Sequence, residues 1–188
     1  MATRREQAQQ RREQFIDAAL AVFAAKGVDG TSIKDIAEAA SVTPGLLYHY
    51  FTGKEALIAA VLTERGFTPQ LRTLLTERAD ESASVVLPEL VGAFDRMLAA
   101  NADLVSVFFS ESHANASAGG ALREFLATGQ SLLESYLSSR AAAGELDPEL
   151  VGVAARTLFA AVSIGHRTGQ RVEPDQLVQL ILNGLIRD

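Results

Sequence analysis

The stretch SVTPGLLYHYFTGKEAL, residues 41–57, decides the fold. Thr43 can cap a helix whose first residue is Pro44, because threonine favours the N-cap and proline lacks only an N–H that is unpaired at this position. Three rings follow in succession, and Phe51 comes directly after them. Leu47 lies four residues before Phe51, so both can share the inward face of one short element. We therefore expect a short helix that ends in a group of rings.

Helical periodicity continues on both sides of this stretch. Apolar residues recur at spacings of three and four from Phe15 to Phe23, the pattern of one buried helix face, and Gly27 ends that helix. Thr31 or Ser32 can cap the next helix. No segment alternates as a half-buried strand does, so the predicted fold class is all-α. The expected helices are 11–25, 31–40, 43–50, one that begins at 54, and segments near 85–100, 102–113, 118–143, 148–168 and 174–187.

Two short helices separated by a tight break and packed on a longer helix make a helix-turn-helix unit. In such a unit the second helix enters the major groove of DNA with its N-terminal residues leading. Gly45 has no side chain to hold the backbone away from a base or phosphate, and the rings and Lys54 offer hydrogen-bond donors. The candidate DNA-binding residues are Thr31, Ser32, Lys34, Thr43, Pro44, Gly45, Leu46, Tyr48, His49, Tyr50 and Lys54.

Two of these residues keep an alternative role. Tyr50 can contact a phosphate or pack against the first helix, and the pattern does not separate the two. Thr31 is a candidate helix cap first and a candidate phosphate contact second.

The segment from Phe23 to Leu57 resembles the N-terminal domain of tetracycline-repressor (TetR) family transcription regulators, and the resemblance covers about residues 11–60. The chain departs from the family pattern at Ser41, where many members have glycine, so this serine must take a left-handed or turn conformation. It departs again at His49, since many members have histidine one position later. The family pattern falls on Phe23, Gly27, Thr31, Ser32, Ile36, Ala37, Val42, Thr43, Gly45, Tyr48, Tyr50, Phe51, Lys54, Glu55 and Leu57.

The resemblance implies a helix-turn-helix DNA-binding domain, placed at residues 1–53, and an effector-binding and dimerisation domain, placed at residues 54–188. It implies a homodimeric repressor that binds double-stranded DNA at a pseudo-palindromic operator and leaves it when a small molecule binds the body. A DNA-binding protein without an effector is the first alternative, and a ligand-sized cavity in the body would separate it from an effector-responsive repressor. A helical enzyme is the second alternative.

The last two predicted helices provide physical support for a dimer. The final helix has an apolar face wider than one core contact needs, and the preceding helix is rich in alanine and glycine, which permits close helix approach. A four-helix interface from two chains is the expectation, and a helix enclosed within one monomer is the alternative. The predicted interface residues are Leu158, Val162, Leu177, Ile181, Leu182 and Leu185.

The candidate effector pocket is defined less sharply. Its residues are apolar and adaptable side chains with three polar anchors, and for each of them a place in the core or on the surface is the alternative to a ligand contact. The apolar bias predicts a small, mostly hydrophobic effector. The candidates are Phe94, Met97, Phe108, Phe109, Glu111, His113 and His166.

The charge distribution is compatible with a DNA-binding N-terminal part. The net charge is −6, yet residues 1–60 hold seven Lys/Arg and seven Asp/Glu, so the acidic excess lies entirely in residues 61–188. A basic tip on a neutral domain can approach DNA despite an acidic body. The arginines between Arg4 and Arg12 are either a solvated tail or an arm that contacts phosphates or the minor groove.

Several classes of function find no support in the sequence. The absence of cysteine excludes disulfides, cysteine-based zinc sites and thiol catalysis. No Gly-x-Gly pair marks a nucleotide loop, and the three histidines lack the spacing of a helical metal site. We expect no enzyme activity, cofactor or metal. The N-terminus lacks the apolar core of a signal peptide, and the apolar run Leu150–Gly165 is too short to span a membrane, so we expect a cytoplasmic protein.

Overall fold

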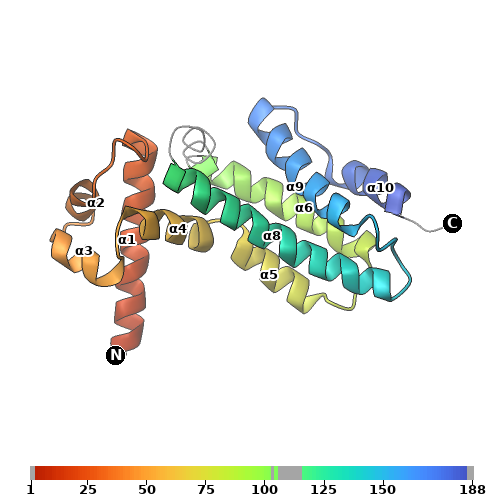
Figure 1. Cartoon of the computed structure of the whole chain (residues 1–188), viewed down its shortest axis with the longest axis horizontal. Helices are drawn as coiled ribbons and strands as arrows, with labels where there is room; N and C mark the ends of the chain where they lie inside the picture. The colour runs from red at the N-terminus through yellow and green to blue at the C-terminus, as the bar shows by residue number, and fades with distance from the viewer. Residues whose placement is uncertain (1–2, 103, 106–115, 186–188) are drawn as a thin grey trace. The chain divides into compact units, whose positions relative to one another are not determined.

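The computed structural model of the chain, shown in Figure 1, consists of helices joined by short connections. It describes residues 3–102, 104–105 and 116–185, and every regular element in them is a helix, as predicted. The expected helix 102–113 lies almost wholly outside the described residues. The helices are α1 (Arg4–Lys26), α2 (Ile33–Ala39), α3 (Pro44–Tyr50), α4 (Lys54–Arg65), α5 (Thr68–Glu77), α6 (Ala83–Ala100), α8 (Ala116–Ala142), α9 (Val151–Thr168) and α10 (Pro174–Leu185).

Contacts divide the chain into two compact units. Unit 1 comprises Met1–Gly66 and Ala102–Phe125, and unit 2 comprises Phe67–Asn101 and Leu126–Asp188. This division differs from the predicted domain boundary after residue 53, because it places α4 with the helix-turn-helix. The physical reason is that α4 packs on α1 and buries a row of apolar side chains.

The core of unit 1 holds the helix-turn-helix together. α1 packs against α2 and α4, and α2 packs against α3. α3 contributes Leu47, which is fully buried, and Phe51 follows at its end with 4% of its surface exposed. Because these two side chains anchor the short helix, most of its remaining side chains are free to face outward. The fully buried side chains of this core include Phe15, Ile16, Phe23, Ile36, Leu47, Leu57 and Ile58.

The turn between α2 and α3 depends on Ser41. This residue has φ of 55°, the left-handed conformation that its place in the turn requires. The Ser41 amide donates to the Glu38 carbonyl at 3.0 Å, and the Val42 amide donates to the Ala37 carbonyl at 2.9 Å. These are the two hydrogen bonds of a Schellman motif, which ends a helix and is most often built on glycine. The predicted turn geometry at this serine is therefore confirmed.

Unit 2 is built around α6, which packs against α5, α9 and α10. Its centre holds a chain of three rings: the centroid of Phe94 lies 5.0 Å from that of Phe67 and 5.2 Å from that of Phe159. α9 begins at Val151, later than the predicted start at 148. The preceding residues form a turn instead, in which the Glu149 amide donates to a carboxylate oxygen of Asp147 at 2.9 Å.

Candidate nucleic-acid interface

α3 presents most of its surface to solvent. Only Leu47 is fully buried, and Tyr48 has 55% of its surface exposed, a large fraction for an aromatic residue. The fold does not use these outer side chains for packing, so they are available to a partner. The exposed residues at and around the start of the helix are Thr43, Pro44, Gly45, Leu46, Tyr48 and His49.

Gly45 is not required by the fold. Its φ does not lie in the left-handed region, and a Cβ built on it meets no atom within 4 Å. Glycine in a helix is less stable than alanine by roughly 0.5–1 kcal/mol, so this position carries a cost without any gain in packing. The open surface above it lets a partner approach the helix backbone closely, as the sequence suggested.

Thr43 occupies the N-cap position, as predicted, but its hydroxyl makes no capping hydrogen bond. The helix instead begins with backbone bonds, in which the Thr43 carbonyl accepts from the Leu46 amide at 3.1 Å. The exposed hydroxyl is therefore not used in stabilising the helix and can donate to a partner.

The three successive rings have different surroundings. The Tyr50 ring meets the Phe15 ring edge to face at a centroid distance of 5.2 Å, so it packs against α1. Of its two predicted roles, packing is the one seen in the structure. His49 lies against Tyr50 at 5.7 Å and stays exposed, and Tyr48 faces solvent. Tyr48 and His49 are thus the rings that a partner can reach.

Lys54 has a structural role that the sequence did not reveal. Its ammonium donates to the carbonyl oxygens of Val28, at 2.9 Å, and Thr31, at 3.1 Å. These bonds tie the first residue of α4 to the segment between α1 and α2. The predicted role as a free phosphate-binding charge therefore needs correction, because two of the three ammonium donors are already used.

Thr31 is not available for DNA contact. Only 3% of its surface is exposed, and its hydroxyl donates to the Gly27 carbonyl at 2.6 Å. Ser32 caps α2 in its place: its hydroxyl accepts from the Asp35 amide at 3.2 Å, and its own amide donates to the Asp35 carboxylate at 2.8 Å. Proximity in sequence could not decide which of the two adjacent hydroxyls faced inward. Lys34, on the first turn of α2, is exposed as expected.

An ion pair joins α1 to the start of α2. The Lys26 ammonium lies 2.5 Å from a carboxylate oxygen of Asp35. This hydrogen bond, together with those from Ser32, holds the pKa of Asp35 well below its usual range, and the same pair raises the pKa of Lys26. The carboxylate therefore stays ionised near the candidate interface, while the lysine beside it compensates its charge.

The candidate effector residues are only partly described. Phe94 and Met97 lie on α6 with 5% and 7% of their surfaces exposed, so both belong to the core of unit 2. His166, on α9, faces Asp95 of α6 with a distance of 3.6 Å between Nδ1 and the carboxylate. That Nδ1 atom is buried and forms no hydrogen bond with any residue the structure describes. The side chains of Phe108, Phe109, Glu111 and His113 lie outside the described residues.

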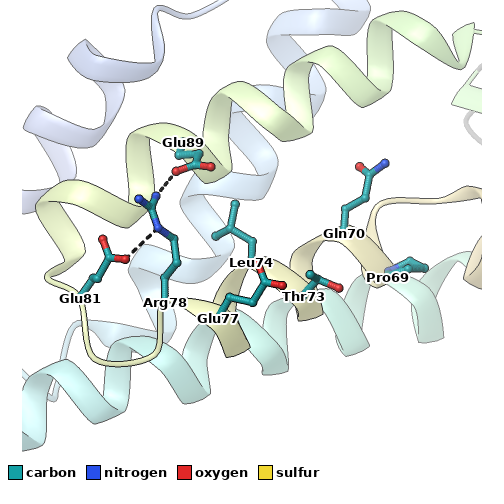
Figure 2. A pocket seen from close by; sticks show the side chains of 8 residues that line it. All are labelled: Pro69, Gln70, Thr73, Leu74, Glu77, Arg78, Glu81 and Glu89. Carbon is teal, nitrogen blue, oxygen red and sulfur yellow. Dashed lines mark hydrogen bonds and ion pairs between the residues drawn. The ribbon is translucent and has the colours of Figure 1, made fainter.

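Two grooves on unit 2 do not coincide with the predicted pocket. The larger, of about 710 Å³, is open and is lined by polar and charged residues together with Pro69 and Leu74. Figure 2 shows Arg78 paired with both Glu81 and Glu89. A second groove of about 360 Å³ lies between α5 and α8 beside Tyr136, where burial raises the pKa of the phenol to about 12. Neither groove is lined by Phe94 or Met97. The larger groove is lined by Pro69, Gln70, Thr73, Leu74, Glu77, Arg78, Glu81 and Glu89.

The predicted dimer contacts need correction in part. Leu158, Val162 and Leu177 are 1%, 2% and 8% exposed, so they pack inside their own chain rather than facing a partner. Ile181 and Leu182 are half-buried, and the side chain of Leu185 lies outside the described residues. Among the described residues of these two helices, the large apolar side chains that are exposed are instead Val153, Ile164 and Leu180, at 54%, 62% and 71%. Periodicity located apolar helices correctly but could not say which of their faces α6 covers.

Other kinds of site find no support in the described part of the chain. Across these residues, no group of three or more acidic or histidine side chains is arranged to bind a metal ion. No described helix combines the length and the hydropathy needed to cross a membrane.

Comparison with known proteins decides the family. Residues 15–61 match the family model described as bacterial regulatory proteins, tetR family. The transcriptional repressor KstR2 of Rhodococcus jostii is 41% identical over 61 residues, which are 32% of this chain and 29% of that protein. Residues 15–61 carry the DNA-binding domain of the TetR family. Because the match to KstR2 spans less than a third of that relative, it concerns the helix-turn-helix part of the chain.

Solved structures extend the likeness from this domain to the whole fold of the chain. Salmonella enterica GusR is 27% identical with a TM-score of 0.72, and the alignment covers 94% of this chain and 95% of that one. The fatty acid degradation regulator FadR of Bacillus halodurans is 25% identical with a TM-score of 0.68, covering 91% and 95%. The helical body after the helix-turn-helix is thus also part of the shared fold.

Proposed function

We propose that this protein is a transcription repressor that binds operator DNA through α3. The observation that carries the proposal is the open helix surface at Gly45, next to the exposed Tyr48 and His49. A major groove admits a helix, and close approach of the backbone brings these donors within reach of phosphates and base edges. The fold does not need a glycine at this position. A partner that approaches the helix backbone closely does need one, because any side chain there would stand between the two surfaces.

The repressor acts as a homodimer on a pseudo-palindromic operator. Support comes from Val153, Ile164 and Leu180, which are more than half exposed on helices otherwise packed into the core. Val153 and Ile164 share one side of α9, since they are three helical turns apart. A second copy of the chain would remove these side chains from water. Two symmetry-related copies would place two α3 helices in successive major grooves.

The effector is a small, mostly apolar molecule bound in the helical body, and the protein works in the cytoplasm, where bacterial DNA lies. The rings of Phe67, Phe94 and Phe159 give unit 2 an apolar centre of the kind such a ligand requires. The likeness to a fatty acid degradation regulator supports the same ligand class. Binding that favours a body conformation with the wrong spacing of the two α3 helices would release the operator.

The experiment begins with selection of bound sequences from random double-stranded DNA. A pseudo-palindromic consensus is the expected result. Tyr48→Phe should then bind the selected duplex more weakly than wild type, while Tyr136→Phe, which alters a phenol in unit 2, should bind normally. Recovery of no preferred sequence would overturn the repressor proposal. A screen of fatty acids, acyl thioesters and polar metabolites for release of the duplex tests the effector class separately.

A further inference from the structure

The N-terminal part of α1 extends past the core it belongs to. α1 begins at Arg4, earlier than the predicted start at Arg11, and Figure 1 shows its first turns projecting beyond α2 and α3. Thr3 caps the helix, because its hydroxyl accepts from the Glu6 amide and the Glu6 carboxylate accepts from the Thr3 amide at 2.7 Å. The buried residues of α1 begin at Phe15. The turns before it form an ordered, exposed extension, residues 4–11.

Four arginines prolong the core-facing side of α1 onto this extension. Positions separated by seven and eleven residues lie on one side of a helix. Arg4 and Arg11 therefore lie on the line of the buried Phe15, and Arg5 and Arg12 lie on the line of the buried Ile16. The two lines are Arg4, Arg11, Phe15 and Val22, and Arg5, Arg12, Ile16 and Phe23.

Arg12 marks the point where the packed part of α1 ends. Its guanidinium lies over the Phe51 ring, 5.0 Å from the centroid, and it pairs with Glu64. Phe51 directly follows the last residue of α3, so the extension begins beside the C-terminal end of that helix. The side of α1 that faces the core thus continues outward, beyond Arg12, as a basic surface.

The other three arginines, Arg4, Arg5 and Arg11, are exposed. They form no ion pair or hydrogen bond with another residue that the structure describes. Arg4 and Arg5 also stand in the first turn, where the positive end of the helix dipole disfavours cations. Neither packing nor helix stability accounts for these side chains.

The acidic residues of the same helix lie on the opposite side. Glu6, Glu13 and Asp17 follow one line at spacings of seven and four. Each is engaged within the chain: Glu6 in the cap, Glu13 with the side-chain amide of Gln9 at 2.9 Å, and Asp17 with Arg65 at 2.7 Å. Positive charge is thereby concentrated on one side of the extension.

We propose that Arg4, Arg5 and Arg11 form a second DNA-contacting surface, which binds phosphates flanking the groove segment that α3 occupies. This inference rests on the proposed function. Arg4 and Arg11 are separated by about 10 Å along the helix axis, which equals the axial rise of about three nucleotides of one DNA strand. The guanidinium groups match phosphate geometry, and their charge complements that of DNA.

The test compares variants on two duplexes that carry the selected operator. One duplex ends at the outer edges of the half-sites, and the other is extended by about half a helical turn on each side. The variant Arg4→Gln/Arg5→Gln/Arg11→Gln removes the surface, and the corresponding triple lysine variant keeps its charge. Gln10→Ala/Gln14→Ala is the control for changes to exposed polar side chains of the same helix. Circular dichroism and thermal melts verify that each variant is folded.

On the extended duplex, the triple glutamine variant should bind at least about tenfold more weakly than wild type. Its salt slope should fall by about 0.9 for each phosphate that the variant leaves without a cationic partner. The lysine variant should recover most of that slope, and the Gln10→Ala/Gln14→Ala control should match wild type. The glutamine variant and wild type should differ little on the short duplex.

Equal affinity and equal salt slope of wild type and the glutamine variant on the extended duplex would overturn this inference, while sequence-specific binding by wild type would leave the proposed function intact. If the glutamine variant loses the same amount of affinity on both duplexes, binding to the flanking phosphates is also overturned. If wild type prefers no DNA sequence, the proposed repressor function is overturned, and the proposed DNA contact of this arginine surface is overturned with it.

Discussion

The Lys54 ammonium donates a hydrogen bond of 2.9 Å to the carbonyl oxygen of Val28. With the second bond, to Thr31, it holds the start of α4 against the segment that enters α2. One side chain thereby fixes the start of α4 to the segment that joins α1 and α2. Both bonds form within the chain, before any partner is bound.

Replacing Lys54 by methionine should lower the free energy of unfolding by about 1–3 kcal/mol, because two part-buried carbonyls lose their donor. Urea denaturation measures this change. Lys34→Met, at an exposed lysine of the same unit, should stay within about 0.5 kcal/mol of wild type. Equal stability of the Lys54 variant and wild type would show that the two hydrogen bonds contribute nothing.

Gly45→Ala should separate DNA binding from stability. The added methyl group meets no atom of the chain, and alanine favours the helix, so stability should be unchanged or rise by up to about 1 kcal/mol. Operator affinity should fall, because the methyl group stands between the helix backbone and DNA. Thermal melts and a binding titration measure the two effects. Full operator affinity in the alanine variant would contradict close approach at this position.

Ser41→Gly tests the strained turn between α2 and α3. Glycine adopts the left-handed conformation without steric cost, so the variant should be as stable as wild type or more stable by up to about 1 kcal/mol. Ser41→Val should instead lose about 1 kcal/mol or more, since a β-branched residue is poorly tolerated at positive φ. Urea denaturation of both variants provides the comparison. If Ser41→Val is as stable as Ser41→Gly, residue 41 does not need the left-handed conformation.

Asp95 should make the stability of the fold depend on pH. The Arg171 guanidinium, which binds the Asp95 carboxylate, and to a lesser extent His166, lower the pKa of this group. A carboxyl with a lowered folded pKa stabilises the protein above its unfolded value, near 3.8, and this contribution is lost as the pH falls through the folded pKa.

The melting temperature of wild type should therefore exceed that of Asp95→Asn at neutral pH, and the gap should narrow below about pH 4. The difference in melting temperature between wild type and Arg171→Gln, which removes the partner of Asp95, should narrow over the same pH range. A gap that stays constant from neutral to strongly acid pH would mean that the ion pair does not stabilise the fold.

Ile164→Glu and Leu180→Glu should convert the dimer to monomers that remain folded. Both side chains are more than half exposed in the single chain, so a charge there disturbs only packing against a partner. Val85→Glu, at another exposed apolar residue, is the matched control and should leave the dimer unchanged. Sedimentation velocity distinguishes the two states. Leu158→Glu, at a buried position, should unfold the chain instead.

The sequence predicted the helices of the N-terminal unit well because their signals are local. Apolar spacing, the proline at the first position of α3 and the glycine after α1 act within a few residues of one another. The left-handed conformation of Ser41 could be expected for the same reason, since the turn leaves one position for it. The start of α1 was missed because residues 4–14 have no apolar stripe, and only the Thr3 and Glu6 capping box marks the true beginning.

The sequence by itself determined the all-α fold, the helix-turn-helix and the exposed rings of α3. The tertiary structure decided which side of each helix is covered. In the folded chain, Thr31 is buried and the Lys54 ammonium is hydrogen-bonded to two backbone carbonyls. Leu158, Val162 and Leu177 lie in the core. These outcomes depend on contacts between residues far apart in the chain, which local periodicity does not contain. A helical pattern specifies an apolar face, but only the packed neighbours specify whether that face meets the chain itself, DNA or a second copy.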